Sequence, residues 1–275
     1  MSGVVPSLRS ALCVVVVAAA VECLVLVSRA QAEDRTLSPE RAAAAARLIA
    51  AYPDQLDRLD GAMLAFKDGT RLVFDDGRGH KSFDEMLAHA DIKDQLAQPY
   101  PAGPGDTPPS ANFDPGRFRN AAFFKKIYGD CAKGQVAAHL VPVDWLPNKK
   151  GGKVMVTSIN GVAGKLKAVS AELDALPPSF DRFLVPSAGT YNCRDVAGTK
   201  QPSMHAYGAA IDINVRQSDY WRWSKPGRGS AIAYRNRVPR EIVSIFERHG
   251  FIWGGKWYHY DTMHFEYRPE LVGGR

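Results

Sequence analysis

One aspartate within an apolar strand constrains this chain more than any other residue. In the segment 203–214, the residues from Ala210 onward alternate as they do in a strand, with Ile211 and Ile213 on one face and Asp212 on the other. A carboxylate among apolar neighbours needs a partner, because an unpaired buried charge is strongly disfavoured. The fold must therefore bring a partner to Asp212.

His205 is the first candidate for that partner. Gly208 permits a tight bend, which would return His205 to the side of the strand that carries Asp212. Imidazole nitrogens and carboxylate oxygens are both ligands of Zn²⁺. A histidine near an aspartate is, however, more often a hydrogen-bonded structural pair, so this segment alone leaves both interpretations open.

A second segment, 253–266, supplies a third candidate ligand, His264. Catalytic zinc typically has three protein ligands and a water molecule, and His264 would complete such a set. Asp261, three residues earlier, would then stand beside the open position as a general base, because zinc lowers the pKa of its water to about 7. The alternative for His264 is a histidine packed behind Phe265.

The two segments together carry a specific motif. Ser-x-His-x-x-Gly-x-Ala-x-Asp, followed by Trp-Gly-Gly-x-Trp and Asp-x-Met-His-Phe-Glu, resembles the zinc D-Ala-D-Ala carboxypeptidase and L-alanyl-D-glutamate endopeptidase family over residues 191–266. That family shares its fold with the hedgehog signalling domain. The resemblance implies one Zn²⁺ per chain, held by His205, Asp212 and His264, with Asp261 as the general base.

Other residues are candidates for contact with the substrate. The family places an arginine upstream of the first ligand, where it binds the substrate carbonyl or carboxylate, and Arg194 is the best match. A guanidinium suits a developing oxyanion because it donates two parallel hydrogen bonds; the alternative is a surface arginine paired with Asp195. Ser203 and His259 are further candidates, although His259 is equally consistent with a histidine at the rim. Glu266 is a candidate partner for a metal ligand.

The first 32 residues have the pattern of an export signal. Arg9 precedes an apolar run from Ala11 to Val27, and Ala-Gln-Ala at 30–32 is the small-x-small pattern that a signal peptidase recognises. The alternative is an uncleaved membrane anchor, but the run is near the lower length limit for a membrane span and contains Glu22. We expect an exported protein, periplasmic or extracellular, without a stable membrane anchor after cleavage.

Export changes the interpretation of the four cysteines. Cys13 and Cys23 would leave with the signal, and Cys131 and Cys193 would remain. Two cysteines in an oxidising compartment often form a disulfide, which we predict here. The alternative is two separate buried thiols, since the sequence does not show whether the residues lie close together.

Charge and composition restrict the partners only weakly. The chain of 275 residues is 45% hydrophobic and carries a formal net charge of +6. That charge suits an anionic polymer such as peptidoglycan, whose peptides we expect as the substrate. The sequence has no basic stripe with interleaved aromatic residues, so we do not expect a nucleic-acid partner. The oligomeric state is left open.

The mixture of predicted elements indicates an α+β fold, because strands and helices do not alternate regularly. We expect a signal peptide over 1–32, a mainly helical N-terminal extension with a Pro/Gly-rich linker over 33–117, and a catalytic domain over 118–275. The stretch dense in proline and glycine, 98–117, is either a linker or an arm that packs on the surface. The resemblance implies that this domain is hedgehog/DD-peptidase-like, with a central antiparallel sheet flanked by helices.

Local patterns predict individual elements along the chain. The predicted helices and strands are helices over 38–51, 82–97, 121–128, 162–176 and 239–249, strands at 72–74, 135–142 and 154–159, and a strand-rich section over 183–266.

The leading functional prediction is a hydrolase in which zinc-activated water attacks an amide bond of a cell-wall stem peptide. The activity would be of the D-Ala-D-Ala carboxypeptidase or the L-Ala-D-Glu endopeptidase type. The competing prediction is a catalytically inactive, zinc-bearing cell-wall-binding module. Asp261 favours the enzyme, because a binding module needs no carboxylate beside the open zinc position. A purely structural zinc site would more often use cysteines, and both motifs lack them.

Overall fold

The computed structural model describes residues 38–101, 103, 108–224 and 232–272. The predicted signal at 1–32 lies outside these residues. The chain divides into residues 1–42 and one compact unit of residues 43–275. The fold is α+β, as predicted, with small antiparallel sheets. Among the described residues, every helix is too short or too polar to cross a membrane.

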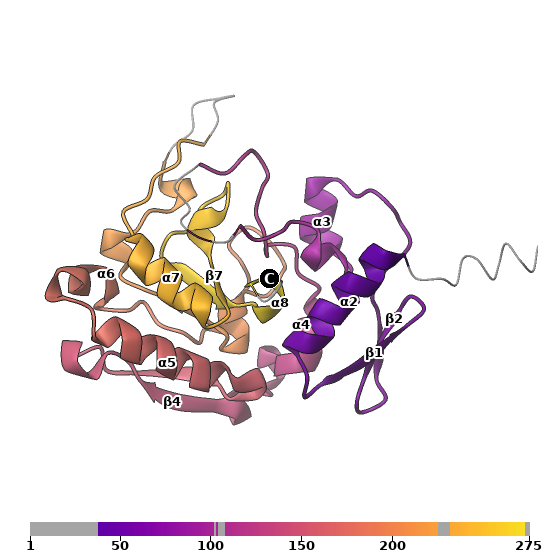
Figure 1. Cartoon of the computed structure of the whole chain (residues 1–275), viewed down its shortest axis with the longest axis horizontal. Helices are drawn as coiled ribbons and strands as arrows, with labels where there is room; N and C mark the ends of the chain where they lie inside the picture. Colours follow the sequence, from indigo (N-terminus) through magenta and orange to yellow (C-terminus); the bar gives the residue numbers. More distant parts are fainter. Residues whose placement is uncertain (1–37, 102, 104–107, 225–231, 273–275) are drawn as a thin grey trace, which may run out of the picture. The chain divides into compact units, whose positions relative to one another are not determined.

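The first sheet follows the first helix. Helix α2 (Pro39–Ala51) has proline at its first position, where the missing N–H costs no hydrogen bond. Strands β1 (Leu56–Asp60), β2 (Met63–Phe66) and β3 (Arg71–Val73) then form an antiparallel sheet in that order (Figure 1). Helix α2 agrees with the predicted helix at 38–51, and strand β3 agrees with the predicted strand at 72–74.

Helix α3 (Phe83–His89) is shorter than the predicted helix over 82–97. Ser82 caps it with a capping box: the Ser82 hydroxyl accepts from the Glu85 amide, and the Glu85 carboxylate accepts from the Ser82 amide. The helix ends at Ala90, which has a non-helical conformation. Helical structure returns only as a short 3₁₀ turn at Asp94–Leu96.

A two-stranded sheet forms the next layer. Strands β4 (Leu140–Asp144) and β5 (Lys153–Thr157) pair antiparallel, and helix α5 (Val162–Asp174) packs against β4 (Figure 1). Helix α4 (Ala121–Tyr128) precedes them and buries the aromatic residues of its core face. All four elements lie close to their predicted positions, although β4 begins several residues later than expected.

The third sheet carries the C-terminal half of the motif. Strands β6 (Ala210–Asp212), β7 (Phe251–Trp253) and β8 (His264–Tyr267) are ordered β6-β8-β7, so β8 is central. Helix α7 (Arg240–Arg248) packs on β7, and its Phe246 stacks on Phe265 of β8 with ring centroids 3.8 Å apart. Aromatic burial therefore fixes β8 against the core.

The section over 183–266 contains less strand than expected. Apart from helix α7, the end of the short helix α6 (Asp181–Leu184), strands β6 and β7 and the first residues of β8, its described residues form short 3₁₀ turns and irregular segments. Many of its apolar residues are nevertheless fully buried, so alternating hydrophobicity there reflects burial and not a continuous ladder.

The described residues of the Pro/Gly-rich arm, 98–101, 103 and 108–117, include Tyr100 and Pro115, which contact the C-terminal elements. The Tyr100 hydroxyl donates to Glu247 Oε1 (2.6 Å) and accepts from the Trp253 amide (3.0 Å). The Trp257 indole donates to the Pro115 carbonyl at 2.7 Å. These contacts join the arm to residues 247–257.

Candidate metal centre

The structure brings the three predicted metal ligands together. Asp212 Oδ1 lies 3.0 Å from His264 Nδ1 and 3.1 Å from His205 Nε2, and the two imidazole nitrogens are 3.1 Å apart. Both histidines are buried, and Asp212 is nearly so. Three donor atoms thus converge on one point.

The opposite nitrogen of each imidazole is already engaged. His205 Nδ1 lies 2.7 Å from the Thr190 carbonyl, to which it donates. His264 Nε2 lies 2.9 Å from Glu266 Oε2. A metal-binding histidine almost always donates its other N–H to such an acceptor, which fixes the tautomer. In the neutral form of each histidine, these contacts leave His205 Nε2 and His264 Nδ1 as the atoms whose lone pairs can bind a metal.

The donor set fits Zn²⁺. Ligands about 2.0 to 2.1 Å from a tetrahedral zinc are about 3.3 Å from one another. The separations of 3.0 to 3.1 Å require only a slight opening of the triangle to reach that value. Two imidazoles and one carboxylate also leave a fourth position open, as a catalytic zinc requires.

Local sequence explains how His205 reaches Asp212. His205 lies in a 3₁₀ turn, η7 (Met204–Tyr207), which the Ser203 hydroxyl caps by accepting from the His205 amide at 3.3 Å. Gly208 ends the turn with φ of +66°, and a Cβ there would lie 2.7 Å from Leu140 Cδ2. Only glycine combines this conformation with this close approach, so the bend that the sequence predicted depends on it.

A buried ionic network lies behind His264. The Glu266 carboxylate accepts from His264 and from Arg119 through Oε2, and Oε1 lies 3.1 Å from Arg268 Nη1. Arg268 also donates to Glu270, whose other oxygen accepts from the Tyr52 hydroxyl at 3.0 Å. Glu266 and Arg268 are fully buried, so each charge requires the others. Glu266 is thus the partner of His264 that the sequence suggested.

Electrostatics match this arrangement. Burial disfavours the charged forms of His264 and Asp212, but their mutual hydrogen bond and those to His205 and Glu266 outweigh it. These contacts raise the pKa of His264 to about 10 and hold the pKa of Asp212 well below its usual range. Arg119 and His264 likewise overcome the burial of Glu266 and hold its pKa low. The site therefore stabilises positive charge at His264, between the carboxylates of Asp212 and Glu266.

Asp261 lines the same cleft as Asp212 and His264. Burial raises its pKa to about 6, and the charge of Asp212 adds to this effect. Its Oδ1 is buried without a hydrogen-bond partner among the described residues. Gly254 holds the backbone here: it accepts from the Asp261 amide at 3.0 Å, and a Cβ on Gly254 would lie 2.5 Å from the Asp261 carbonyl oxygen.

The cleft has a volume of about 300 Å³ and an aromatic wall. The predicted ligands Asp212 and His264 line it, as do the predicted residues Asp261, Arg194, Ser203 and His259. His205 is buried and is not among the lining residues. Its lining residues are Arg117, Arg119, Arg194, Val196, Ala197, Ser203, Asp212, Tyr220, Trp221, Trp223, Trp257, His259, Asp261, Met263 and His264.

The predicted substrate-contact residues differ in how firmly they are held. His259 Nδ1 lies 2.6 Å from Asp114 Oδ2, and the His259 amide donates to Asp114 Oδ1 at 2.9 Å. Ser203 is buried and caps the turn that carries the first ligand. Arg194 is exposed, and its guanidinium donates to the Asp195 carbonyl at 3.3 Å. Arg194 therefore reaches the cleft without making an ion pair with the Asp195 carboxylate.

Sequence reasoning missed three charged residues at the site. Asp114, Arg117 and Arg119 come from the end of the Pro/Gly-rich arm and the residues just after it. Their only sequence signal is a cluster of charges around Phe118, which packs edge-on against Phe83 with ring centroids 5.5 Å apart. Such a cluster in a proline-rich segment more often indicates a solvated linker, so the signal was weak.

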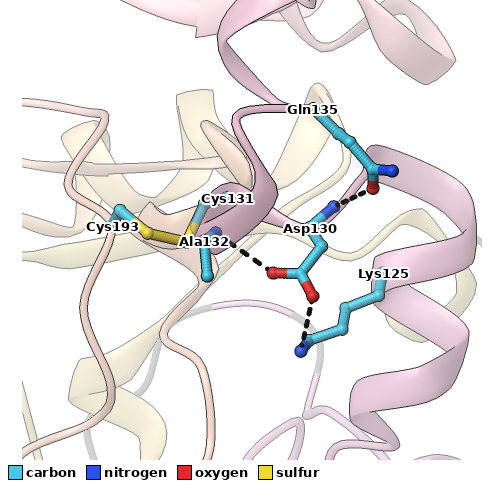
Figure 2. Close-up of a disulfide and its surroundings, with 6 residues drawn as sticks. All are labelled: Lys125, Asp130, Cys131, Ala132, Gln135 and Cys193. Carbon is cyan, nitrogen blue, oxygen red and sulfur yellow. Dashed lines mark hydrogen bonds and ion pairs between the residues drawn. A yellow bond between two sulfur atoms is a disulfide. The ribbon is translucent and has the colours of Figure 1, made fainter.

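A disulfide joins Cys131 and Cys193, as predicted, with Cα atoms 5.7 Å apart. Figure 2 shows Cys131 at the start of a 3₁₀ turn, η2 (Cys131–Lys133), where the Asp130 side chain accepts from the Ala132 amide at 3.1 Å and from Lys125 at 2.9 Å. The bridge thus attaches the residue that precedes Arg194 to a capped turn.

A second group of carboxylates near the N-terminal sheet forms ion pairs with two lysines. Lys81 Nζ lies 2.8, 3.1 and 2.6 Å from carboxylate oxygens of Asp76, Asp91 and Asp94. Asp75 pairs with Lys93 at 2.7 Å. This group is an internal ion-pair cluster and gives no reason to expect a metal.

Comparison with known proteins agrees with the motif. Residues 197–267 match the family described as D-alanyl-D-alanine carboxypeptidase. The match includes His205, Asp212, Asp261 and His264, and it confirms the resemblance that their spacing suggested. Searches of curated proteins and of solved structures found no match to the chain.

Proposed function

We propose that this chain is a zinc-dependent peptidase that hydrolyses amide bonds in peptidoglycan stem peptides. The observation that carries the proposal is the convergence of donor atoms from His205, Asp212 and His264. Asp212 and His264 line a cleft together with Asp261, whose Oδ1 has no hydrogen-bond partner among the described residues. The family match at 197–267 supports a peptidase acting on cell-wall peptides.

The three ligands would hold one Zn²⁺ through His205 Nε2, Asp212 and His264 Nδ1. When bound there, zinc supplies Lewis-acid activation of water and polarisation of the substrate carbonyl. The surrounding protein orients these donors, because the Thr190 carbonyl and the Glu266 carboxylate fix the two imidazole tautomers.

Asp261 acts as the general base and then as the general acid. Its carboxylate takes a proton from the attacking water as the new C–O bond forms, and it then passes that proton to the nitrogen of the leaving amine as the C–N bond breaks. The absence of a hydrogen-bond partner for its buried Oδ1 among the described residues leaves this oxygen available for the proton.

Residues around the cleft bind the peptide. Arg194 stabilises the developing oxyanion with its forked donors, and Ser203 and His259 contact the substrate. Asp114 accepts from the His259 ring and therefore orients its other nitrogen. The scissile bond is of the D-Ala-D-Ala or the L-Ala-D-Glu type, and the aromatic wall formed by Trp221 and Trp257 shapes the cleft around it.

Export and fold complete the proposal. The disulfide and the family match support an exported protein, in the periplasm or outside the cell, whose signal at 1–32 is removed. We also propose that the region over 118–275 has a hedgehog/DD-peptidase-like fold, preceded by the extension over 33–117. The small antiparallel sheets and the surrounding helices are consistent with that fold.

The alternative function is an inactive, zinc-bearing module that binds the cell wall. It would need the three ligands but no buried carboxylate beside them. Asp261, which lines the cleft and has a buried oxygen without a partner among the described residues, therefore favours the enzyme. Incubating purified zinc-loaded protein with defined muropeptides, followed by mass spectrometry of the products, distinguishes the two. Cleavage at one amide bond is expected; binding without any cleavage would establish the module instead.

A further inference from the structure

We infer that Arg117 recognises a free α-carboxylate on the substrate residue that supplies the leaving amine. The inference rests on the proposed function and names the substrate feature that the cleft selects. Arg117 lies outside the segment that matches the family and belongs to the Pro/Gly-rich arm.

The two proposed scissile bonds share this carboxylate. In D-Ala-D-Ala, the terminal residue supplies the amine and carries the free chain terminus. In the L-Ala-D-Glu linkage, D-glutamate supplies the amine and continues the stem through its side-chain carboxyl, which leaves its α-carboxylate free. In both cases the carboxylate carbon is two bonds, about 2.5 Å, from the nitrogen of the bond that is cut. A cation that recognises it must lie near the metal ligands.

Arg117 meets this requirement. Its side chain lines the cleft and is 14% exposed. Its guanidinium lies over the Trp257 ring, 5.7 Å from the centroid, and the centroid of that ring is 5.7 Å from the centroid of His264. One aromatic ring therefore separates Arg117 from a metal ligand, and stacking on that ring holds the guanidinium in place.

The donors of Arg117 are still available. Its closest carboxylate, Asp114 Oδ2, is 3.7 Å from Nη1, which is too far for a hydrogen bond. Both oxygens of Asp114 are already bound by His259. Among the residues that the structure describes, the Arg117 side chain makes no hydrogen bond. The fork can therefore bind a carboxylate with two parallel hydrogen bonds.

The other arginines of the cleft are less suited to this role. Arg119 is buried and donates to Glu266 behind the metal ligands. Arg194 is exposed, lies on a loop and is the residue proposed to bind the carbonyl oxygen of the scissile bond. Arg117 alone among the three combines restraint by packing with a guanidinium that makes no hydrogen bond within the described residues. Discrimination between a carboxylate and an amide requires both properties.

Two matched substrate pairs test the inference with the zinc-loaded protein. In one pair, a stem peptide contains D-glutamate or its α-amide; in the other, a peptide ends in D-Ala-D-Ala or in its C-terminal amide. For the bond that is cut, we expect kcat/KM to favour the carboxylate by about 10- to 100-fold, the usual weight of a hydrogen bond to a charged group. Arg117→Gln should bring this ratio to within about threefold of one.

Control variants separate recognition from catalysis and folding. Arg194→Gln should lower kcat/KM for both members of a pair and keep their ratio. Arg182→Gln, which removes an exposed arginine outside the cleft, should leave the ratio as in the wild type. Zinc content and the melting temperature of each variant report on folding, and Arg117→Lys, which keeps the charge without the fork, should retain part of the preference.

Binding provides the same ratio without turnover. The dissociation constants of the paired peptides for zinc-loaded Asp261→Asn protein, measured by calorimetry, should show the carboxylate preference, and the double variant with Arg117→Gln should lose it. Equal affinities of the paired peptides, no binding of either, or a preference that survives Arg117→Gln would overturn the inference. If the wild type hydrolyses neither peptide but binds the carboxylate peptide more tightly, and Arg117→Gln abolishes that preference, the proposed enzyme is rejected and the carboxylate site is kept.

Discussion

Asp212 and His264 are direct cross-strand partners in the β6–β8 ladder, and the carboxylate of one lies 3.0 Å from the imidazole of the other. A cross-strand register is set by backbone hydrogen bonds along the ladder. Two of the three proposed metal ligands are therefore positioned by the sheet and not by loops, which favours a rigid site.

Loss of either histidine should remove the metal. Elemental analysis of the protein purified without chelator should give about one zinc per chain, and His205→Ala or His264→Ala should lose most of it, because two remaining ligands hold zinc poorly. His139→Ala, which changes an exposed histidine, is the matched control and should keep the zinc. Full zinc in both ligand variants would show that the metal is held elsewhere or not at all.

Asp261→Asn should separate metal binding from turnover. The amide has nearly the same shape, so we expect full zinc and an unchanged melting temperature. It cannot accept the proton, so kcat on the muropeptide substrate should fall by about 10²- to 10⁴-fold. Lower zinc occupancy in Asp261→Asn would make Asp261 a ligand, and unchanged turnover with full zinc would remove it from the mechanism.

Glu266→Gln should weaken both the fold and the metal site. It removes the negative charge that Arg119 and Arg268 share. Arg268 keeps Glu270, but the buried Arg119 loses its carboxylate partner, which costs about 3 to 5 kcal/mol of unfolding free energy. The acceptor for His264 also weakens, so zinc affinity should fall about 10- to 100-fold.

An exposed ion pair provides the control for Glu266. Asp144→Asn removes the partner of Lys153, whose side chain is 67% exposed, and should change the unfolding free energy by less than about 0.5 kcal/mol. Urea unfolding of both variants in the presence of chelator measures the difference without the contribution of the metal. Equal losses in the two variants would mean that the buried network contributes no more than a surface pair.

The Cys131–Cys193 bond should stabilise the protein and should be present in the exported, non-reduced protein. Its sequence separation of 62 corresponds to roughly 4 kcal/mol in the chain-entropy account of cross-links. Cys131→Ser with Cys193→Ser should lower the unfolding free energy by up to that amount. Thiol titration of the unfolded, non-reduced wild-type protein should detect no free thiol from this pair, and two free thiols would contradict the bond.

The sequence predicted local features more reliably than distant ones. Helices with clear signals at their ends, such as α4 and α7, lie within about two residues of their predicted bounds, because caps and amphipathic spacing act over a few residues. The three proposed ligands were also identified, since each lies in a short motif whose spacing is specific. Their metal-binding role stays a prediction.

Features that depend on long-range folding were missed. Asp114 contacts His259 across a sequence separation of 145 residues, and no local pattern encodes that approach. The sequence therefore left open whether the stretch over 98–117 is a linker or an arm that packs on the surface, and it did not predict that Arg117 lines the cleft. The strand-rich interpretation of 183–266 was wrong in extent for a related reason: packing buries apolar residues there without a ladder partner.

The order β6-β8-β7 also determines when this sheet can assemble. The two outer strands do not pair with each other, and β8, which both require, comes last of the described strands in the chain. A polypeptide delivered from its N-terminus, whether by a ribosome or through a secretion channel, carries β6 and β7 without sheet partners until residues 264–267 emerge. The same four residues bring His264, so completion of the sheet and of the ligand set is a single late event.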